Sequence, residues 1–211
     1  MAISKTQLLK FAPQALNPDS LVLALNTTID KFDVNTVRRV RYFMAQVSFE
    51  SMAFTKFEED LFYRDPQRLC DVWPTHFVMT QGDAHRAYAP EYIRNPLKLG
   101  NFIYANRNGN GNQASGDGYL FRGLGPIEVT GRQNYANCSQ FLYQDDRLVQ
   151  HPEQLLLAEP GMMSAGWFWS IHGLNALADQ DSFTRVTQII NGSDSSVSLR
   201  LNVLNKANLI F

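Results

Sequence analysis

Apolar positions near the start of the chain recur every three or four residues, which is the spacing of one helical face. Ser4 and Gln7 form a capping-box pattern, which predicts a short first helix that Pro13 interrupts. Residues 20–32 and 37–50 each place apolar side chains on one face. The pattern therefore predicts two further helices, the second of which runs into Glu50.

The middle of the chain lacks a regular period. Residues 54–63 mix aromatic and acidic side chains, which predicts a loop with short helices. Residues 106–125 contain six glycines and four asparagines, a composition that favours turns, and we expect this segment to form one wall of an active site. Helical spacing resumes at Pro160. Because no repeat or linker divides the chain, we expect one mainly α-helical domain over residues 1–211.

The composition places the chain among ordinary globular proteins. Of its 211 residues 45% are hydrophobic and 18% charged, which excludes disordered and collagen-like classes. A formal net charge of −1 gives no general attraction to nucleic acid or to acidic membranes, so we expect no nucleic-acid partner. The longest strongly apolar run, residues 21–25, is far shorter than the roughly 20 residues of a membrane span. We therefore do not expect a membrane-embedded protein.

The start of the chain and its cysteines bear on compartment and cofactor. The first residues show no apolar signal segment, so we expect synthesis in the cytoplasm without a classical signal peptide. Cys70 and Cys138 are far apart and lack further ligands at zinc spacing, and we expect two separate thiols, although a disulfide between them stays open. We predict no metal and no other cofactor.

One segment matches a calcium-binding loop in part. The oxygen-bearing residues and the glycine lie at ligand offsets, but only Asp117 among them carries a charge. The candidate positions are Asn106, Asn108, Asn110, Gly111 and Asp117. Calcium is therefore a minor alternative.

Carboxylates follow the third predicted helix. Glu50 ends it, and Glu58, Glu59 and Asp60 come shortly after. Hydrolysis of a glycosidic bond uses one carboxylic acid to protonate the leaving oxygen and one carboxylate to activate water or to attack carbon. Acidic runs are more often a solvated surface, so these residues alone leave the function open.

The sequence around these acids resembles glycoside hydrolase family 19, which includes chitinases and phage endolysins. The resemblance covers roughly residues 40–200, in ordered blocks with family-like spacing. The first block is FMAQVSFES at residues 43–51, followed by Phe54, Glu59 and Tyr63; the central blocks are YANRNGN at 104–110, SGDG at 115–118, FRGLGPIEVTG at 121–131 and Asn134–Tyr135; the last are SAGWFW at 164–169, GLN at 173–175, TQIING at 187–192 and Arg200.

This resemblance implies a lysozyme-like, mainly helical fold with little or no sheet, in which two helical lobes flank a substrate cleft and residues 1–39 pack on the catalytic part. It also implies cleavage with inversion. Glu50 corresponds to the general acid, Glu59 to the base and Thr130 to a hydroxyl that holds the attacking water, while Glu58 is the alternative base if the match slips by one.

Inversion requires the two carboxyl groups to lie roughly 6.5–9.5 Å apart. Because nine residues of straight helix span about 13.5 Å, we expect the chain to turn back after Ser51. We also expect Phe49 and Phe54 to keep water away from Glu50.

Other residues match the substrate-binding positions of the family. These are Tyr63, Tyr104, Asn106, Glu128, Tyr135, Asn191 and Arg200. Tyr104 and Tyr135 have a second interpretation as core aromatics, and we assign Trp167 and Trp169 to the core.

The chain also departs from the family pattern. Phe49 replaces a usual histidine, Leu124 a usual arginine and Glu128 a usual glutamine, and Ser193 and Ser196 replace glycines. We expect the added carboxylate of Glu128 to raise neighbouring pKa values, or to pair with Arg122 or another cation.

We expect the β-1,4 glycan strands of bacterial peptidoglycan as the substrate, with chitin as the nearest alternative and an inactive glycan-binding domain as another. The protein would be an endolysin released through a holin, or an antibacterial effector delivered by specialised secretion and paired with an immunity or inhibitor protein. In either case it would act as a monomer in the periplasm or cell wall.

Overall fold

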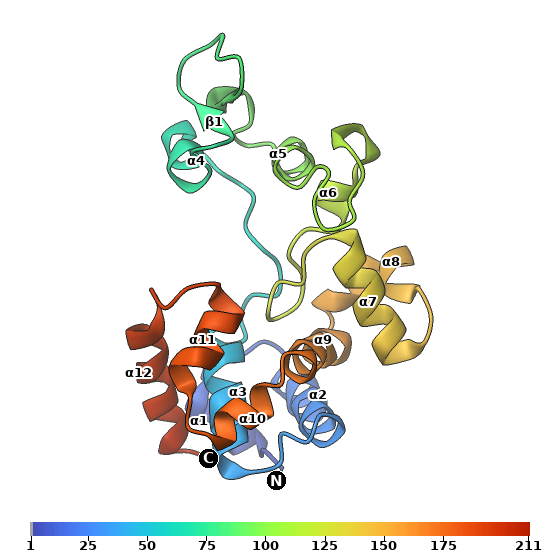
Figure 1. Cartoon of the computed structure of the whole chain (residues 1–211). Helices are drawn as coiled ribbons and strands as arrows, with labels where there is room; N and C mark the ends of the chain where they lie inside the picture. Colours follow the sequence, from blue (N-terminus) through green and yellow to red (C-terminus); the bar gives the residue numbers. More distant parts are fainter. Residues whose placement is uncertain (1) are drawn as a thin grey trace.

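Helices make up most of the fold, as the sequence pattern predicts, and the computed structural model describes residues 2–211 (Figure 1). The α-helices are α1 (Lys5–Phe11), α2 (Pro18–Lys31), α3 (Val37–Glu50), α4 (Pro66–Val72), α5 (Pro96–Ile103), α6 (Asp117–Leu120), α7 (Arg132–Tyr143), α8 (Arg147–Gln150), α9 (Ala158–Ile171), α10 (Leu174–Asp179), α11 (Phe183–Asn191) and α12 (Val197–Asn208). Three short 3-10 helices are η1 (Ala89–Glu91), η2 (Gln113–Ser115) and η3 (Pro152–Leu156).

The three helices predicted at the start of the chain are confirmed. Ser4 and Gln7 form the capping box of α1, each satisfying a backbone N–H group of the other. Helix α2 begins at Pro18, two residues earlier than expected, because proline has no N–H group to leave unpaired in the first turn. Helix α3 begins after Thr36, whose side chain accepts a hydrogen bond from the Arg39 backbone, and it ends at Glu50 as predicted.

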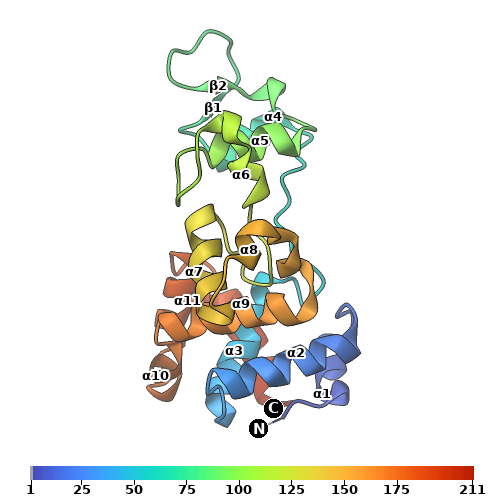
Figure 2. The same ribbon diagram turned by 90° about the vertical axis from the view of Figure 1, so that its right-hand side faces the viewer.

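The large lobe contains α1–α3 and α7–α12 around the larger hydrophobic cluster (Figures 1 and 2). Helix α9 packs against α2, and this contact joins the N-terminal helices to the C-terminal half. Trp167 and Trp169 are buried in this core, as predicted, and the Trp169 ring meets the edge of Phe43 at 5.3 Å. The end of α3 faces the small lobe (Figure 1).

The small lobe has a hydrophobic cluster of its own, built on Leu61, Leu69, Phe77 and Leu99. It contains α4–α6 and a parallel pair of two-residue strands, β1 (Phe77–Val78) and β2 (Ala87–Tyr88). The predicted architecture of two helical lobes with little sheet is therefore confirmed. The assignment of residues 1–211 to one domain stays a prediction.

The glycine- and asparagine-rich segment is largely irregular, as predicted, and only η2 and α6 interrupt it. Both Asp117 carboxylate oxygens accept hydrogen bonds from Arg132, at 2.7 and 2.9 Å, and the Gly111 N–H group donates to one of them at 2.9 Å. Asp117, the one charged residue of the calcium alternative, is thus already neutralised by an arginine. This segment is a structural tie between α6 and α7.

Within residues 2–211, no helix has both the length and the apolar character that crossing a bilayer requires.

Candidate active site

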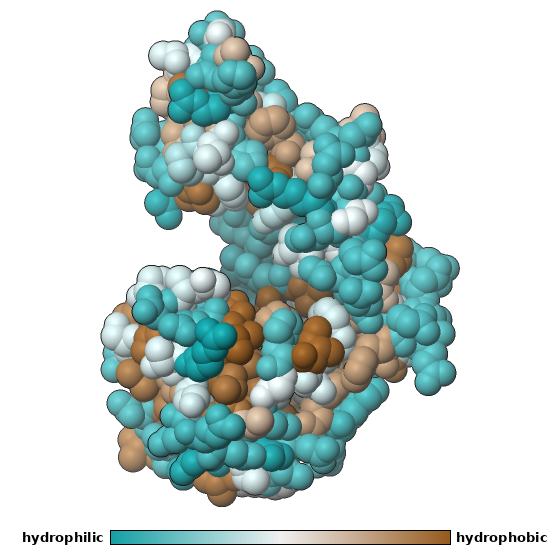
Figure 3. Space-filling model, viewed as in Figure 1, coloured by the Kyte–Doolittle hydropathy of each residue, from teal (hydrophilic) through white to brown (hydrophobic). Residues whose placement is uncertain are grey.

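A deep hollow opens between the two lobes (Figure 3). Helix α3 leads toward it from the large lobe and ends at Glu50, and the segment that follows crosses to the small lobe and carries Glu59 (Figure 1). The two predicted catalytic acids therefore lie at the junction of the lobes.

The chain reverses between the two acids, as predicted. Met52, Ala53 and Phe54 all adopt left-handed backbone conformations, with φ of 49°, 59° and 60°. A left-handed conformation costs roughly 1–2 kcal/mol per non-glycine residue. Ser51 supports the turn, because its hydroxyl accepts a hydrogen bond from the Phe54 N–H group at 3.1 Å. Strain concentrated beside a catalytic carboxylate is a common feature of functional sites.

Arg200 holds the Glu50 carboxylate. One guanidinium nitrogen, Nη2, donates to Glu50 Oε1 and, at 3.2 Å, to Asn191 Oδ1. The other two guanidinium nitrogens also donate: Nη1 to Gln46 Oε1 at 2.6 Å and Nε to Ser196 Oγ at 2.9 Å. Arg200 is fully buried, whereas 24% of the Glu50 side chain is exposed. The carboxylate is therefore anchored from inside the protein and open on one side.

The two phenylalanines expected near Glu50 differ in their surroundings. The Phe49 ring stacks on the Arg200 guanidinium, with the ring centre 4.3 Å from Cζ, and Phe54 lies fully inside the core. Because Arg200 also holds Glu50, Phe49 lies beside this ion pair, and the expectation that the phenylalanines keep water from Glu50 stays a prediction.

Glu59 is held by two hydrogen bonds. Its Oε1 accepts from the Gly123 N–H group at 2.6 Å, and its Oε2 accepts from the Tyr104 hydroxyl at 2.7 Å. Burial raises the pKa of the Glu59 carboxyl above its usual value, while both hydrogen bonds and the charge of Arg122 act in the opposite direction. Burial and the charge of Glu59 also raise the pKa of Tyr104, which keeps this hydroxyl protonated as a donor.

Gly123 lies where three predicted site residues come together. A Cβ atom at this position would lie 3.0 Å from Glu128 Cβ, 3.3 Å from Thr130 Oγ1 and 3.4 Å from Glu59 Cβ. A side chain at position 123 would therefore occupy the space between these groups, so glycine is what allows them to converge.

Glu128 interacts with both predicted catalytic acids. Burial raises the pKa of the Glu128 carboxyl, and the negative charges of Glu59 and Glu50 raise it further. Lys56 opposes this effect, with its Nζ 3.8 Å from Glu128 Oε1. The expected cation partner of Glu128 is therefore Lys56, because Arg122 is occupied by Glu58.

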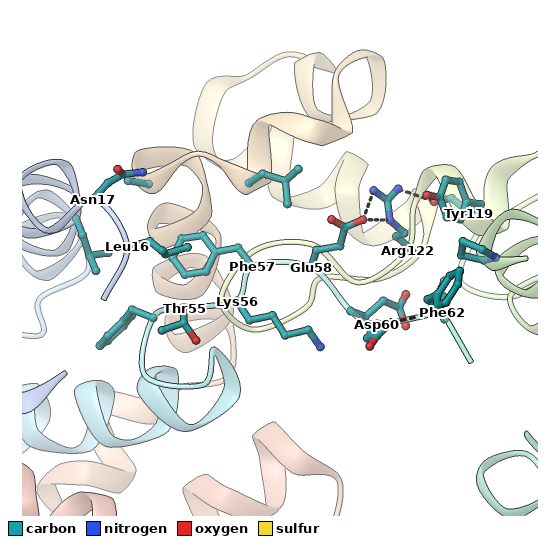
Figure 4. A pocket seen from close by; sticks show the side chains of 17 residues that line it. Leu16, Asn17, Thr55, Lys56, Phe57, Glu58, Asp60, Phe62, Tyr119 and Arg122 are labelled. Carbon is teal, nitrogen blue, oxygen red and sulfur yellow. Dashed lines mark hydrogen bonds and ion pairs between the residues drawn. The ribbon is translucent and has the colours of Figure 1, made fainter. Parts of the chain in front are cut away.

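Glu58 points away from this group. Its Oε1 accepts hydrogen bonds from Arg122 at 2.6 and 2.8 Å, and Figure 4 shows it on the side of the segment opposite Lys56 and Asp60. A cavity of about 570 Å³ lies along this segment between the lobes; Glu58 and Glu59 line it, whereas Glu50, Glu128 and Thr130 do not. Because Glu58 pairs with Arg122, it lies apart from the group around Gly123, and Glu59 as the base stays a prediction.

Comparisons with known proteins identify the family. No protein-family model matches the chain. A glycosyl hydrolase family 19 domain-containing protein of Haemophilus influenzae is 30% identical over 206 residues, which span 95% of this chain and 92% of that protein. The chain belongs to glycosyl hydrolase family 19. The family resemblance in the sequence is thereby confirmed, and with it the class of glycoside hydrolase.

Two solved structures share the fold of this family 19 chain. Chitinase C from Streptomyces griseus superimposes with a TM-score of 0.61 at 18% identity, covering 99% of this chain and 76% of the chitinase. A bacterial family 19 chitinase superimposes with a TM-score of 0.62 at 17% identity, covering 100% of this chain and 95% of the chitinase. At these identities the likeness concerns the fold, and it confirms the predicted lysozyme-like architecture.

Two of the predicted sugar contacts are wrong. Tyr135 is completely buried, its hydroxyl donates to the Arg122 carbonyl oxygen at 2.7 Å, and its ring packs on Phe121. It is therefore a core aromatic, the second interpretation given above. Arg200 is also fully buried, and its guanidinium N–H groups donate to other protein groups. It therefore holds Glu50 in position instead of touching a sugar.

The other predicted contacts stay accessible. Asn106 and Asn191 are exposed, and Asn106 has a left-handed backbone with φ of 58°. Tyr63 is half-buried with its ring 5.3 Å from that of Trp73. Their roles toward substrate stay predictions.

Several residues of the site were not singled out from the sequence. Lys56 and Gly123 lie beside the predicted acids, and Gln46 lies one helical turn before Glu50. The position of Gln46 four residues before an acid on an apolar helix was a usable signal, since such residues share a helical face. Lys56 offered no such sequence signal, because its partner Glu128 is 72 positions away in sequence, from residue 56 to residue 128.

The departures from the family pattern have structural consequences. Ser196 and Ser193, at positions where glycine is usual, supply hydroxyls that accept hydrogen bonds from Arg200 and from Asn191, both near 3 Å. Leu124 is buried, and its backbone forms isolated antiparallel bridges with Glu58 and Val129, so the arginine usual there would have to be accommodated in the core.

In the part of the chain that the structure describes, no cluster of histidine, cysteine and acidic side chains could hold a metal ion, and both cysteines are free thiols. Burial raises the pKa of the Cys138 thiol to about 12 and raises that of Cys70 as well. Neither thiol is thus set up as a nucleophile.

Proposed function

We propose that this family 19 chain hydrolyses the β-1,4 bonds of peptidoglycan glycan strands with inversion at the anomeric carbon, using Glu50 as the acid and Glu59 as the base. The observation that carries this proposal is the convergence of Glu59, Thr130 and Glu128 on Gly123, with Glu128 also responding to the charge of Glu50. Two carboxyl groups in different surroundings, facing one space, are what inversion requires.

The base step follows from the contacts of Glu59 and Thr130. The Thr130 hydroxyl donates its proton to the Glu128 carbonyl oxygen at 2.8 Å, which leaves its lone pairs free to accept. A water between the two residues would donate one proton to Thr130 Oγ1 and the other to Glu59, and turn a lone pair toward the anomeric carbon. A raised pKa makes Glu59 a stronger base for this step.

The acid step uses the open side of Glu50. Arg200 and its partners fix Oε1 from within the protein. Oε2 remains available to carry a proton and deliver it to the glycosidic oxygen as the bond breaks.

The shape of the site is compatible with peptidoglycan. The hollow is open along one edge (Figure 3), so a glycan lying in it keeps that edge toward solvent. Such an opening accommodates the peptides on alternate sugars of peptidoglycan. Chitin is the second candidate, because two solved structures that share this fold are chitinases by name. On the first substrate the protein would act in the periplasm or cell wall, after holin release or specialised secretion, as a monomer that an immunity or inhibitor protein could block.

The test is digestion of purified sacculi and of chitin oligosaccharides in parallel, with product masses, new reducing ends and the anomer formed first read by NMR. We expect fragments from sacculi, an α anomer first, and loss of both in Glu50→Gln and Glu59→Gln. The matched control is Glu58→Gln, which removes a carboxylate one position away and should keep activity.

Cleavage of chitin alone would move the assignment to the second candidate. Binding to sacculi without any cleavage by the unaltered chain would leave a glycan-binding domain and overturn the enzymatic proposal.

A further inference from the structure

Three helices place pairs of residues four positions apart around one guanidinium. Helix α3 contributes Gln46 and Glu50, helix α12 contributes Arg200 and its N-cap residue Ser196, and helix α11 contributes Asn191, with Thr187 one turn before it. Residues four apart share a helical face, so each helix offers two adjacent positions to the same space. Thr187 is the one member that does not contact Arg200; it contacts Gln46.

We propose that Gln46 and Thr187 are positioning residues for catalysis: Thr187 holds the Gln46 amide in place by accepting a hydrogen bond from its Nε2, and the held amide keeps Arg200 where it anchors Glu50. This inference rests on the proposed role of Glu50 as the acid.

The amide of Gln46 has only one favourable orientation. Its Oε1 accepts from Arg200 Nη1 at 2.6 Å, and its Nε2 donates to Thr187 Oγ1 at 2.8 Å. An arginine side chain has donors and no acceptor, so a flipped amide would set an NH₂ group against an N–H group. All three residues are fully buried. The arginine therefore decides which way the amide points, and the threonine hydroxyl accepts from the amide NH₂ group and holds the amide in place.

The position of Arg200 matters because, within residues 2–211, Glu50 is the one carboxylate it contacts. If the bond to Gln46 is lost, the guanidinium is free to turn toward Asn191 and Ser196, and Glu50 Oε1 loses its fixed partner. A displacement of about 1 Å in a catalytic group is enough to lower a rate by up to roughly a hundredfold. Neither Gln46 nor Thr187 touches the hollow, so substrate binding is left as it is.

The decisive comparison is Thr187→Val against Thr187→Ser. Valine keeps the shape of threonine and removes the acceptor, whereas serine keeps the hydroxyl. With the substrate that the unaltered chain cleaves, we expect kcat to fall about tenfold to a hundredfold in Thr187→Val with KM within about twofold, and to stay within about twofold in Thr187→Ser. Gln46→Met should match Thr187→Val.

The double variant Gln46→Met, Thr187→Val should be no slower than Gln46→Met alone, because Thr187 acts through Gln46. Asn175→Ala controls for general loss of stability: Asn175 bonds Trp169 Nε1 and the Phe32 carbonyl oxygen, both at 2.9 Å, in another part of the large lobe. We expect it to lower the Tm while kcat is retained.

Equal kcat in Thr187→Val and the unaltered chain, or independent losses in the double variant, would overturn the inference. A crystal structure of Thr187→Val provides a readout that does not depend on activity: the Gln46 amide should move from its place beside Arg200 and the Arg200–Glu50 contact should change. An unchanged contact would also overturn the inference. Absence of cleavage by the unaltered chain would instead count against the proposed function.

Discussion

Lys56 Nζ lies 3.8 Å from Glu128 Oε1, and this pair borders both predicted catalytic acids. The lysine charge lowers the pKa of Glu128 and also that of Glu59. The Glu128 charge has the opposite influence on a neighbouring carboxyl, because two negative charges repel. Lys56 and Glu128 thus tune the same base in opposite directions.

The first prediction is that Lys56→Met and Glu128→Gln shift the pH profile with opposite signs. As the base, Glu59 must be ionised, so the acidic limb of kcat follows its pKa. Loss of the lysine charge raises that pKa and should move the limb to higher pH, whereas loss of the Glu128 charge should move it to lower pH. Initial rates over pH 3–9 check this, and shifts of the same sign in both variants would contradict it.

Tyr104→Phe is the second prediction. The phenol donates to Glu59 Oε2 at 2.7 Å and lowers the pKa of that carboxyl, so its removal should raise the pKa and move the acidic limb to higher pH. Near neutral pH we expect kcat to fall about tenfold, since a hydrogen bond to a charged group contributes roughly 1.5 kcal/mol or more. Tyr92→Phe is the control, because Tyr92 packs on Phe77 in the small lobe. A profile for Tyr104→Phe that overlays the unaltered one would be incompatible with this contact.

The sequence predicted the helices well where local signals decide them. Ser4 with Gln7 marks the start of α1, and the apolar spacing to Glu50 marks the length of α3. It also predicted the reversal after Ser51, because two acids nine residues apart can face one sugar only if the helix ends between them. Its success for the family came from ordered blocks of residues rather than from either acid alone, and the roles of Glu50 and Glu59 stay predictions.

Sequence reasoning failed where the outcome depends on burial. Tyr135 and Arg200 fit motif positions, but a motif does not say whether a side chain faces the hollow or the core, and both face inward. Lys56 escaped notice for a related reason, since its partner Glu128 comes from a distant segment that only the fold brings near. Contacts between segments far apart in the chain are what the pattern of single residues cannot specify.

The third prediction concerns stability and Glu59. A carboxyl whose pKa is raised by folding contributes stability that is fully present below its unfolded pKa and is lost as the pH rises through its folded pKa. At pH 7 the ionised, buried Glu59 is therefore unfavourable for the folded state, and Glu59→Gln should raise the Tm while kcat falls about 1000-fold or more.

The difference in Tm between Glu59→Gln and the unaltered chain should disappear as the pH falls to about 4, where Glu59 becomes protonated in both the folded and the unfolded state. Thermal unfolding of both proteins between pH 3.5 and 8 measures it. Glu58→Gln serves as the reference, because it breaks an ion pair with Arg122 and should leave the Tm at pH 7 equal or lower. A stability difference for Glu59→Gln that stays constant with pH would argue against burial as the cause of the raised pKa.

The last prediction is that Gly166→Ala destabilises the contact between α9 and α2. A Cβ atom at Gly166 would lie 2.6 Å from Thr28 Cγ2 and closer still to the Phe32 ring. Both neighbours are buried, and neither a β-branched side chain nor a packed ring can move aside without disturbing the core. Overpacking of this kind costs about 1–3 kcal/mol, which lowers the Tm of a domain of this size by roughly 2–12 °C.

Helix propensity alone predicts the opposite sign, since alanine is favoured over glycine inside a helix by about 1 kcal/mol. Ser170→Ala on the exposed side of α9 isolates that propensity effect and should change the free energy of unfolding by less than about 0.5 kcal/mol. Because Gly166, Thr28 and Phe32 make no contact with Glu50 or Glu59, the folded variant should keep its kcat. An increase in the Tm of Gly166→Ala would mean that α2 and α9 lie farther apart than the structure places them.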